Sequence, residues 1–225
     1  MHEPGVGYLG GVDVPAFLAD DENALASAAP TVRVGVVRRP TLSFGVGHRP
    51  DPAVQARAAE RGWGLAGRRS GGTSLYHAPG DLVWSIVLPR RDARVGRDYA
   101  HAYVRLGAGL VDWLAGLGVT SAWELASDAF PPYCLLNGLG RTLRVSGRAV
   151  AGAAQHATRS GMLHHGGVSV SLDETALTAV FDLPDDVLAA DLAGLRTFGV
   201  SETSERLARG LTAALERFVA APATR

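Results

Sequence analysis

Arginines and glycines that lie next to one another in the stretch 68–77 are the residues whose types and spacing most clearly indicate binding chemistry. The stretch contains Arg68, Arg69, Ser70, Gly71, Gly72, Thr73 and His77. Adjacent glycines let backbone N–H groups converge on a ligand without interference from a Cβ atom, and such amide groups favour anions. The arginines add planar donors suited to phosphate or carboxylate. From the residues alone two interpretations stay open: an anion-binding loop, or a surface turn with exposed arginines.

Cys134, the one cysteine of the 225-residue sequence, lies in the segment 130–134 before a predicted hairpin. A nucleophilic cysteine needs a base near it in space, and His77 and His165 are the candidates that the sequence offers. The other interpretation is a cysteine that packs as a small hydrophobic residue. A single cysteine also excludes an intrachain disulfide, which argues against a secreted, disulfide-stabilised scaffold.

Histidines and small residues occupy two predicted strands further along the chain. His164 and His165 are adjacent, so on a strand their rings point to opposite faces and do not chelate one metal ion, and we predict no metal site. Residues 147–155, which include Gly152, carry small side chains on both faces. This pattern indicates that something packs close to the backbone, or that the strand lies in the crowded centre of a sheet.

Gly5, Gly7 and Gly10 match the spacing of a dinucleotide-binding fingerprint, but their context argues against that function. The fingerprint follows a strand and opens a helix, whereas no strand precedes these glycines and no strongly periodic helix is visible after them. We therefore expect a flexible or turn-rich N-terminus. The sequence contains no serine-centred nucleophile elbow and no Walker-type phosphate loop.

Hydrophobic periodicity predicts the elements that must position these residues. Strands are expected at 31–37 and 82–88, in a hairpin that turns at Ser146-Gly147, and at 163–172. Helices are expected at 52–61, between an Asp51 cap and Gly62, at 98–118, capped by Asp98, and at 204–219. Large aromatic side chains are interpreted as core residues, namely Trp63, Trp84, Trp113 and Trp123.

This order of elements predicts an α+β fold with mixed, largely antiparallel sheets flanked by helices. Strands joined by tight turns favour antiparallel pairs over a doubly wound sheet. No linker rich in Pro, Gly or Ser separates two cores, so residues 1–225 are predicted as a single domain, with 181–225 as a small C-terminal lobe in the alternative.

Composition narrows the class of protein. Lys+Arg and Asp+Glu number 22 each, a balance that argues against a nucleic-acid partner, and 47% hydrophobic residues suit a substantial core. The sequence shows no signal-peptide pattern and no apolar run near the roughly 20 residues of a membrane helix. We therefore expect a cytoplasmic protein with neither nucleic acid nor membrane as partner.

Three segments, in this order, resemble the biotin/lipoate protein ligase family, specifically its lipoate–protein ligase and octanoyltransferase branch. Residues 40–45 resemble the early strand of that family, 68–77 its arginine- and glycine-rich ligand loop, and 163–166 its late histidine–glycine strand. The resemblance runs from Pro40 to Phe218. It implies a biotin/lipoate ligase-like catalytic domain that transfers a lipoyl or octanoyl group to a lysine of a carrier domain.

The resemblance also implies which residues bind the acyl group or its adenylate. These are Arg68, Arg69, Ser70, Gly71, Gly72, Thr73, His77, Gly152, His165 and Gly166. Thr73 stands where relatives often carry a third glycine or an arginine, and Asp81 where asparagine is common. Cys134 lies where some octanoyltransferases carry the cysteine that forms an acyl-thioester without ATP, and the resemblance implies that it is the nucleophile.

The main departure from the family is Ala149, which stands at the position of the catalytic lysine. An ammonium there stabilises charge on the acyl carbonyl and phosphate, and electrostatic help of this kind is worth about 2.7–4 kcal/mol. Arg148 is adjacent but should point to the opposite face of the strand. Arg144, reaching in from the neighbouring strand, is the alternative cation.

Three functional hypotheses follow, and the first is preferred because the ligand loop and the histidine–glycine strand are retained. The first is acyl transfer, either by a ligase that needs ATP and Mg²⁺ or by a cysteine acyltransferase without cofactors. The second is a non-catalytic relative that binds an acyl ligand or a carrier protein. The third is a ligase-fold enzyme with another substrate. The expected partners are lipoate or octanoate and a lipoyl carrier domain, either of a 2-oxoacid dehydrogenase E2 or of the glycine cleavage H type, with the chain itself a monomer.

Overall fold

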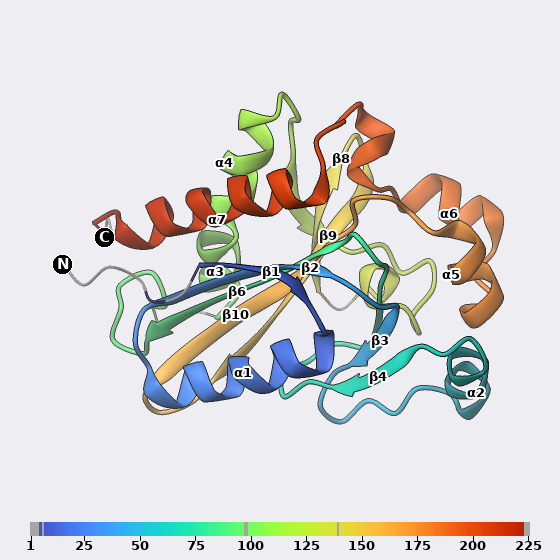
Figure 1. Cartoon of the computed structure of the whole chain (residues 1–225), viewed down its shortest axis with the longest axis horizontal. Coiled ribbons are helices and arrows are strands. Elements are labelled where there is room, and N and C mark those ends of the chain that lie inside the picture. Colours follow the sequence, from blue (N-terminus) through green and yellow to red (C-terminus); the bar gives the residue numbers. More distant parts are fainter. Residues whose placement is uncertain (1–4, 6, 97–98, 139, 223–225) are drawn as a thin grey trace.

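A seven-stranded sheet runs through the middle of the molecule (Figure 1). The computed structural model describes residues 5, 7–96, 99–138 and 140–222. β1 and β2 are parallel, and all the other neighbouring pairs of this sheet are antiparallel. In spatial order the strands are β1 (Tyr8–Val12), β2 (Thr31–Val37), β6 (Leu82–Pro89), β10 (Gly161–Val168), β9 (Arg148–Ala157), β8 (Arg141–Val145) and β7 (Ala122–Leu125).

A second, smaller sheet has three strands, in the order β4 (Gly64–Gly67), β3 (Thr41–Phe44) and β5 (Ser74–His77). β3 is parallel to β4 and antiparallel to β5. Together the two sheets confirm the predicted α+β class with mixed, largely antiparallel sheets.

Helices cover the two faces of the large sheet in different ways (Figure 1). On one face lie α3 (Tyr99–Leu106), α4 (Ala108–Gly116) and α7 (Ser204–Ala220), with the 3-10 helix η2 (Leu195–Phe198). On the other face α1 (Val14–Ser27) contacts β6 and β10 and also touches β4. Around the small sheet are α2 (Pro52–Glu60), α5 (Glu174–Phe181), α6 (Asp185–Asp191) and the 3-10 helix η1 (Cys134–Leu136).

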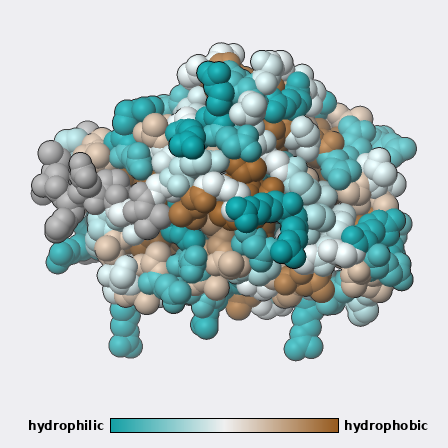
Figure 2. Space-filling view, in the orientation of Figure 1, coloured by the Kyte–Doolittle hydropathy of each residue, from teal (hydrophilic) through white to brown (hydrophobic). Residues whose placement is uncertain are grey.

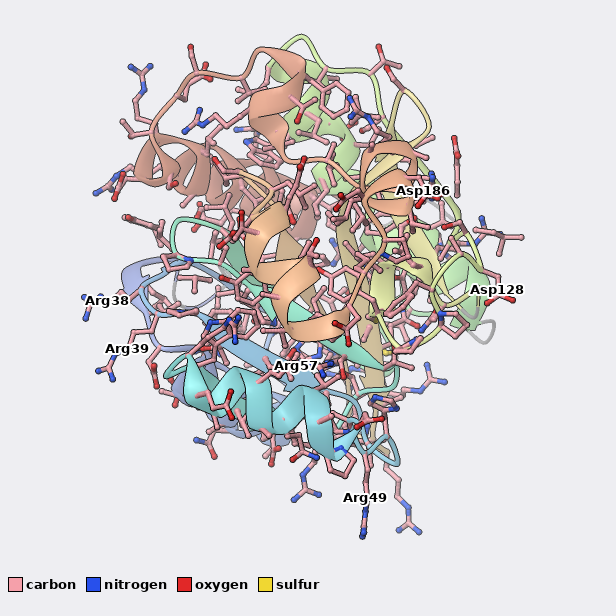
Figure 3. All side chains as sticks on the ribbon, turned by 90° about the vertical axis from the view of Figure 1, so that its right-hand side faces the viewer. Arg38, Arg39, Arg49, Arg57, Asp128 and Asp186 are labelled. Atoms are coloured by element: carbon pink, nitrogen blue, oxygen red, sulfur yellow. The ribbon has the colours of Figure 1, made fainter. Side chains whose placement is uncertain are left out.

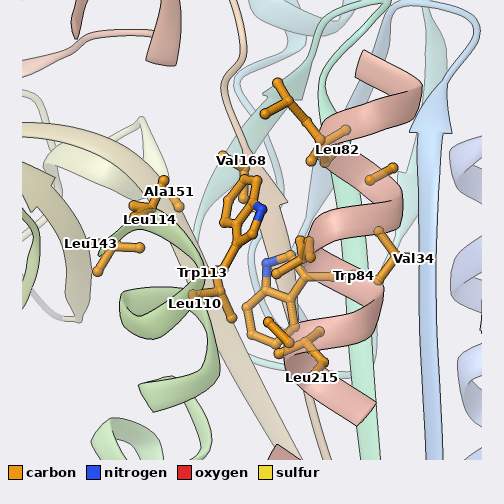
Figure 4. Packing of buried hydrophobic residues seen from close by; sticks show 14 of the residues in the cluster. Val34, Leu82, Trp84, Leu110, Trp113, Leu114, Leu143, Ala151, Val168 and Leu215 are labelled. Atoms are coloured by element: carbon orange, nitrogen blue, oxygen red, sulfur yellow. The ribbon is translucent and has the colours of Figure 1, made fainter. Parts of the chain in front are cut away.

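The main core lies between the large sheet and its α3, α4 and α7 layer. Trp84 of β6 is fully buried there, and Figure 4 shows it beside Trp113 of α4 and Leu215 of α7. A second core joins the small sheet to α2, α5 and α6, where the rings of Trp63 and Tyr76 stack at 4.1 Å. All four tryptophans are buried, which confirms their interpretation as core residues. On the face drawn in Figure 2, hydrophobic residues reach the surface only in small areas among hydrophilic ones.

Several predicted elements are confirmed because their signals are local. The Asp51 side chain accepts a hydrogen bond of 2.7 Å from the Ala53 N–H at the start of α2, and Gly62 follows the helix with φ of +69°. The β8–β9 hairpin turns at Ser146 and Gly147, which both have positive φ as a two-residue turn requires.

The N-terminus differs from the prediction of a turn-rich segment. Residues 8–12 form β1, parallel to β2, and α1 follows at once. Sequence periodicity missed α1 because the buried face of the helix includes a carboxylate, Asp21, among Val14, Phe17 and Leu25. The glycine pattern nevertheless lies before and within an edge strand, and not at the strand-to-helix turn that a dinucleotide site requires.

The predicted helix 98–118 is two helices that meet at Gly107. The Trp123 side chain donates a hydrogen bond of 2.9 Å to the Gly107 carbonyl, and a Cβ atom at Gly107 would overlap the indole ring. The break between the two helices therefore depends on Trp123, a residue of β7. The predicted cap, Asp98, lies outside the described residues.

The predicted strand 163–172 begins earlier and ends earlier, at Gly161 and Val168. Beyond Val168 the backbone binds partners other than β6: the Val170 N–H donates to the Asp81 carboxylate at 2.9 Å. Asp81 also accepts from the Ala78 N–H at 2.9 Å, so this buried carboxylate ties the turn before β6 to the end of β10. Burial raises the pKa of Asp81 to about 7, against the lowering effect of these backbone donors.

The alternative that residues 181–225 form a small C-terminal lobe stays a prediction. In the structure α7 contacts β2 and α4 across the main core, while α5 contacts α2. Figure 3 shows Arg57 of α2 facing α5, where its guanidinium donates to the Val180 carbonyl at 2.8 Å and lies 3.1 Å from the Asp182 carboxylate.

His164 is a polar residue inside the main core. Its ring is fully buried and lies 5.1 Å from the rings of both Trp84 and Tyr103, and neither nitrogen has a hydrogen-bond partner among the described residues. Burial, and then the charge of His165, lowers the pKa of His164 to about 3. Between pH 6.5 and about 3, His164 is therefore neutral in the folded protein, whereas an unfolded chain would bind a proton there.

We expect His164→Phe to make folding less sensitive to acid. Because the pKa of His164 is lowered to about 3 by folding, its protonation favours the unfolded state as pH falls from 6.5 towards 3. Relative to wild type, the variant should gain up to about 1.4 kcal/mol of unfolding free energy per pH unit over that window. Urea unfolding at pH 8, 6 and 5 measures this gain, and a constant difference between the two proteins would contradict the assignment.

Candidate functional site

A cavity lies between α1 and the large sheet, beside the small sheet. Its apolar wall comes from Val14, Phe17 and Leu18 of α1, with Leu75 of β5 and Val83 of β6. Polar and ionisable side chains line the rest, namely Ser43, Arg68, His77, Cys134 and His165. An apolar compartment with a few convergent polar groups suits a ligand that has an alkyl chain and a polar head.

Small residues of β9 and β10 form another wall of this cavity, lined by Gly152, Ala153, Ala154 and Gly166. A Cβ atom at Gly152 would lie 2.5 Å from Leu135 of η1, and one at Gly166 would overlap the Gly152 carbonyl. Both interpretations of the small residues therefore hold: the strands are crowded, and Ala153 and Ala154 leave room for a ligand beside them.

Arg68, which is only 8% exposed, connects the polar groups of the cavity. Its Nη1 donates to Ser43 Oγ at 3.0 Å, and its Nη2 donates to the Thr73 carbonyl at 2.9 Å. The same Nη2 lies 3.7 Å from Cys134 Sγ. Arg68 therefore joins the ligand loop to the cysteine, which are 66 residues apart in sequence.

His77 contacts the same serine as Arg68. Its Nε2 shares a hydrogen bond of 2.8 Å with Ser43 Oγ, the atom to which Arg68 donates. Burial, and then the positive charges of Arg68 and His165, lowers the pKa of His77 to about 3. A neutral His77 at pH 7 can hold Ser43 in place, and its ring is separated from the thiol by Ser43 and Arg68.

A second set of hydrogen bonds runs through the interior and ends at the ligand loop. Arg33 Nη1 donates to Asp21 Oδ1 at 2.6 Å, and Asp21 Oδ2 accepts from His165 Nδ1 at 2.8 Å. The other ring nitrogen, Nε2, lies 2.7 Å from Ser70 Oγ. All four side chains are buried. Because an ionised carboxylate only accepts, Nδ1 carries a proton, and in the neutral ring Nε2 accepts from the Ser70 hydroxyl.

The glycines of the loop border an open cleft on the other side of Cys134. Gly71, Gly72 and Thr73 line it, together with His48, Tyr103, Asn137, Arg141 and residues 152–155 of β9. Gly72 has φ of +93°, and a Cβ atom there would lie 2.8 Å from Arg68 Nη2 and 2.9 Å from Cys134 Sγ. Glycine is required at this position both by the backbone and by the contact between guanidinium and thiol.

The residues predicted for the site therefore do not all line one cavity. The cavity beside α1 is lined by Arg68, His77, Cys134, Gly152, His165 and Gly166, and the cleft by Gly71, Gly72 and Thr73, with Cys134 and Gly152 in both linings. Ser70 is buried, and its hydroxyl shares a hydrogen bond with His165. Arg69 is exposed and pairs with Glu22 at 2.9 Å, in the lining of a neighbouring groove. Their roles as ligand-binding residues stay predictions. The two adjacent histidine rings do point to opposite faces, as predicted.

Ala149 and the two arginines near it lie away from the cavity. Ala149 is buried in the second core, and its carbonyl accepts from the Ala193 N–H. Arg148 stacks over the Phe198 ring at 5.2 Å, on the opposite face as expected. Arg144 donates to the Gly147 carbonyl and to Asp191 at the hairpin, so it does not reach the cavity as a replacement cation.

Sequence patterns missed the supporting residues Asp21, Arg33 and Ser43. Each is a common polar residue within an apolar stretch, and its partner lies far away in the chain. An arginine between the alternating valines of the predicted strand 31–37 is the one signal that the sequence carried for the Asp21–Arg33 pair.

No helix in the described part of the chain combines the length and the apolar character needed to cross a membrane. The same residues contain no cluster of three or more His, Cys, Asp or Glu side chains suited to hold a metal ion.

A family model and individual sequences both relate this chain to proteins of lipoyl and octanoyl transfer. A family model described as the lipoyl protein ligase A/B catalytic domain matches residues 18–215. The octanoyltransferase LipM of Oceanobacillus iheyensis is 28% identical over 160 residues, which are 70% of this chain and 58% of that protein. LipM of Geobacillus kaustophilus is 28% identical over 188 residues, covering 76% and 67%. The chain thus spans 58% to 67% of the length of these two relatives.

Solved structures share the fold. A crystal structure of lipoate-protein ligase A bound with ATP has a TM-score of 0.79 at 22% identity, covering 96% of this chain and 85% of that one. A putative lipoate protein ligase from T. acidophilum with bound lipoic acid has a TM-score of 0.77 at 22% identity, with the same coverage. A biotin protein ligase from Aquifex aeolicus has a TM-score of 0.52 at 12% identity, covering 94% and 68%.

We expect Asp21→Asn to destabilise the fold strongly, because it removes the buried carboxylate that pairs with the Arg33 guanidinium and leaves only the exposed Asp20 as a charged partner. Removing one member of a buried ion pair costs about 3–5 kcal/mol of unfolding free energy. Asp20→Asn is the matched control, since Asp20 also contacts Arg33, at 3.2 Å, but is 64% exposed. It should cost less than about 1 kcal/mol. Urea unfolding measures both, and equal losses would argue against a special role for the interior carboxylate.

We expect Gly72→Ala to lower the unfolding free energy by about 1–3 kcal/mol, because alanine is strained at this φ and its Cβ displaces Arg68 or Cys134. Gly71→Ala is the control: a Cβ atom there meets no atom within 4 Å, so its effect should stay within about 0.5 kcal/mol. Thermal and urea unfolding compare the two. If both alanines are tolerated equally, the close approach at Gly72 is not a constraint.

Proposed function

The chain belongs to the lipoyl protein ligase A/B catalytic-domain family, and from this premise we propose that it transfers an octanoyl or lipoyl group from a thioester donor to a lysine of a carrier domain. In this proposal the group passes through Cys134 and no ATP is used. The LipM octanoyltransferases among its relatives support this choice of reaction.

The observation that carries the proposal is the position of Cys134 between the two hollows. Its side chain lines both the cavity beside α1 and the cleft beside the loop glycines. An alkyl chain held against Phe17, Leu18 and Val83 places its carbonyl at the polar wall that contains the thiol. The donor, and later the acceptor lysine, can approach from the cleft. A nucleophile at such a junction suits a reaction with two large partners and one small acyl group.

The reaction has two balanced steps. The Cys134 thiolate attacks the donor thioester, so that a new carbon–sulfur bond forms, the old one breaks, and the donor thiolate takes a proton from water. The amine of the carrier lysine then attacks the acyl-cysteine. A carbon–nitrogen bond forms, the cysteine thiolate leaves, and the amine loses one proton to water.

The binding roles within this proposal follow the positions of the residues. Arg68, His77, Gly152, His165 and Gly166 enclose the acyl head, and the Gly71–Thr73 backbone faces the cleft. The proposed acceptor is a lipoyl domain of the 2-oxoacid dehydrogenase E2 or glycine cleavage H type. Support for this class comes from one solved neighbour, which is described as a lipoate protein ligase and its E2 lipoyl domain from Thermoplasma acidophilum.

An ATP-dependent ligase is the second candidate, favoured by the likeness of the fold to lipoate-protein ligase A bound with ATP. The open cleft with Gly71, Gly72 and Arg141 would then hold the nucleotide and its Mg²⁺. Ala149 counts against the ligase and the transferase alike, because an ammonium at that position would stabilise negative charge in either reaction. A non-catalytic protein that binds an acyl ligand is the third.

We expect intact-mass analysis of a lipoyl carrier domain to show an octanoyl adduct after incubation with this protein and an octanoyl-carrier thioester, without ATP. Cys134→Ser should reduce the rate below about 1% of wild type, because the acyl-enzyme step is lost. A parallel reaction contains free octanoate or lipoate with ATP and Mg²⁺.

An adduct that forms only with ATP, and equally well with Cys134→Ser, would establish the ligase and reject the cysteine route. If neither reaction modifies the carrier while calorimetry detects octanoate or lipoate binding, the protein is a binding relative. Arg49→Gln is the control for a loss of surface charge, because Arg49 is exposed and projects from the molecule in Figure 3.

A further inference from the structure

The 225-residue sequence contains no lysine, because all 22 residues counted as Lys+Arg are arginines. The position of the family lysine, Ala149, is 1% exposed and packs among apolar residues such as Tyr133 and Leu192. Acyl transfer at Cys134 therefore lacks not only the usual ammonium but any ε-amine from these residues. Another group must stabilise the negative charge that develops at the reacting sulfur and carbonyl.

Arg68 is the residue with a permanent charge among the described side chains that line the cavity beside α1. Its guanidinium is buried, and its partners are the neutral oxygens of Ser43 and Thr73. No ion pair between Arg68 and a carboxylate occurs in the described part of the chain. A buried charge without a counter-ion is costly, so this site favours an anion next to it.

The anion that this geometry best accommodates is at Cys134. Nη2 of Arg68 lies 3.7 Å from Sγ, within the range of a hydrogen bond to sulfur. Burial lowers the pKa of Arg68, whereas the charge and the hydrogen bond of Cys134 raise it. Gly72 makes the contact possible, since a side chain there would come between guanidinium and thiol.

Other basic groups are placed less well for this role. Arg144 and Arg148 are held at the hairpin and over Phe198. His77 is neutral and reaches the thiol only through Ser43 and Arg68, and His165 is bound between Asp21 and Ser70. Arg141 lines the cleft but not the cavity beside α1.

We propose that Arg68 takes over the electrostatic part of the family lysine's role, stabilising the Cys134 thiolate and the oxygen of the thioester during transfer. The proposal rests on the proposed function and names the residue that makes it possible without lysine. A guanidinium keeps its proton in proteins, so Arg68 is not a base. The thiol proton goes to water before attack, and the departing donor thiolate takes one from water.

Alkylation of Cys134 tests the proposal without any acyl substrate. The chain has one cysteine, so each label adds one known mass. Neutral iodoacetamide reports the reactivity of the thiolate, and iodoacetate, which carries a negative charge, reports in addition the positive charge beside it. Rates at pH 7 are compared for wild type, Arg68→Gln, Arg68→Lys and Arg49→Gln.

We expect Arg68→Gln to slow alkylation by iodoacetamide about tenfold, and to lower the ratio of the iodoacetate rate to the iodoacetamide rate. A tenfold change corresponds to about 1.4 kcal/mol of lost thiolate stabilisation. Arg68→Lys keeps a charge and should keep most of that ratio, although the fork geometry is lost. Arg49→Gln should stay within about twofold of wild type, because exposed charges are screened.

Alkylation of folded Arg68→Gln at the wild-type rate and ratio would overturn the proposal. If Arg68→Gln does not fold, as judged by circular dichroism, Arg68→Lys decides. Retention of the wild-type ratio supports a charge effect, and its fall to the ratio of free cysteine rejects one. Acyl transfer is assayed separately. Transfer that depends on Cys134 but survives Arg68→Gln rejects this inference alone, whereas wild type with an Arg68-dependent thiol and no acyl transfer rejects the proposed function alone.

Discussion

A carboxylate without access to solvent, that of Asp21, ties together the segments on which the site depends. It accepts hydrogen bonds from Arg33 on β2 and from His165 on β10, while its own residue belongs to α1. Through His165 the same connection reaches Ser70 in the ligand loop. A buried ion needs partners with good geometry to offset its desolvation, so α1, the large sheet and the loop are held in one relative arrangement. The apolar wall that α1 contributes to the cavity is a consequence of this arrangement.

Close backbone packing is the second constraint, and it shapes the opposite wall. Gly166 must be glycine because the Gly152 carbonyl occupies the space of its Cβ, and Gly152 must be glycine because Leu135 does the same. These contacts bring η1, which begins with Cys134, against β9. The cysteine therefore reaches the cavity because the strand beneath it has a glycine at the point of contact and only alanines beside it.

The electrostatics of the site differ from those expected of a protein with a lysine on β9. Position 149 belongs to an apolar core in this chain, and the buried positive charge is Arg68, which comes from the ligand loop itself. One residue then has two tasks, as it organises Ser43 and Thr73 and also faces the thiol. Two neutral histidines fit this picture: burial lowers the pKa of His77 and of His164 to about 3, so neither competes with Arg68 as a charge near pH 7.

Local sequence was enough to predict features whose cause is local. The cap at Asp51, the glycine after α2 and the Ser146-Gly147 turn all depend on residues that are neighbours in the chain. The fold class followed from the same signals, because tight turns imply antiparallel pairs. Tertiary structure decided the rest, since the interactions join residues far apart: 144 positions separate Asp21 from His165, 95 separate Ser70 from His165, and 66 separate Arg68 from Cys134. A carboxylate on a helix looks the same in sequence whether it faces water or an arginine in the core, and only the packed structure gives it the partners that stabilise it there.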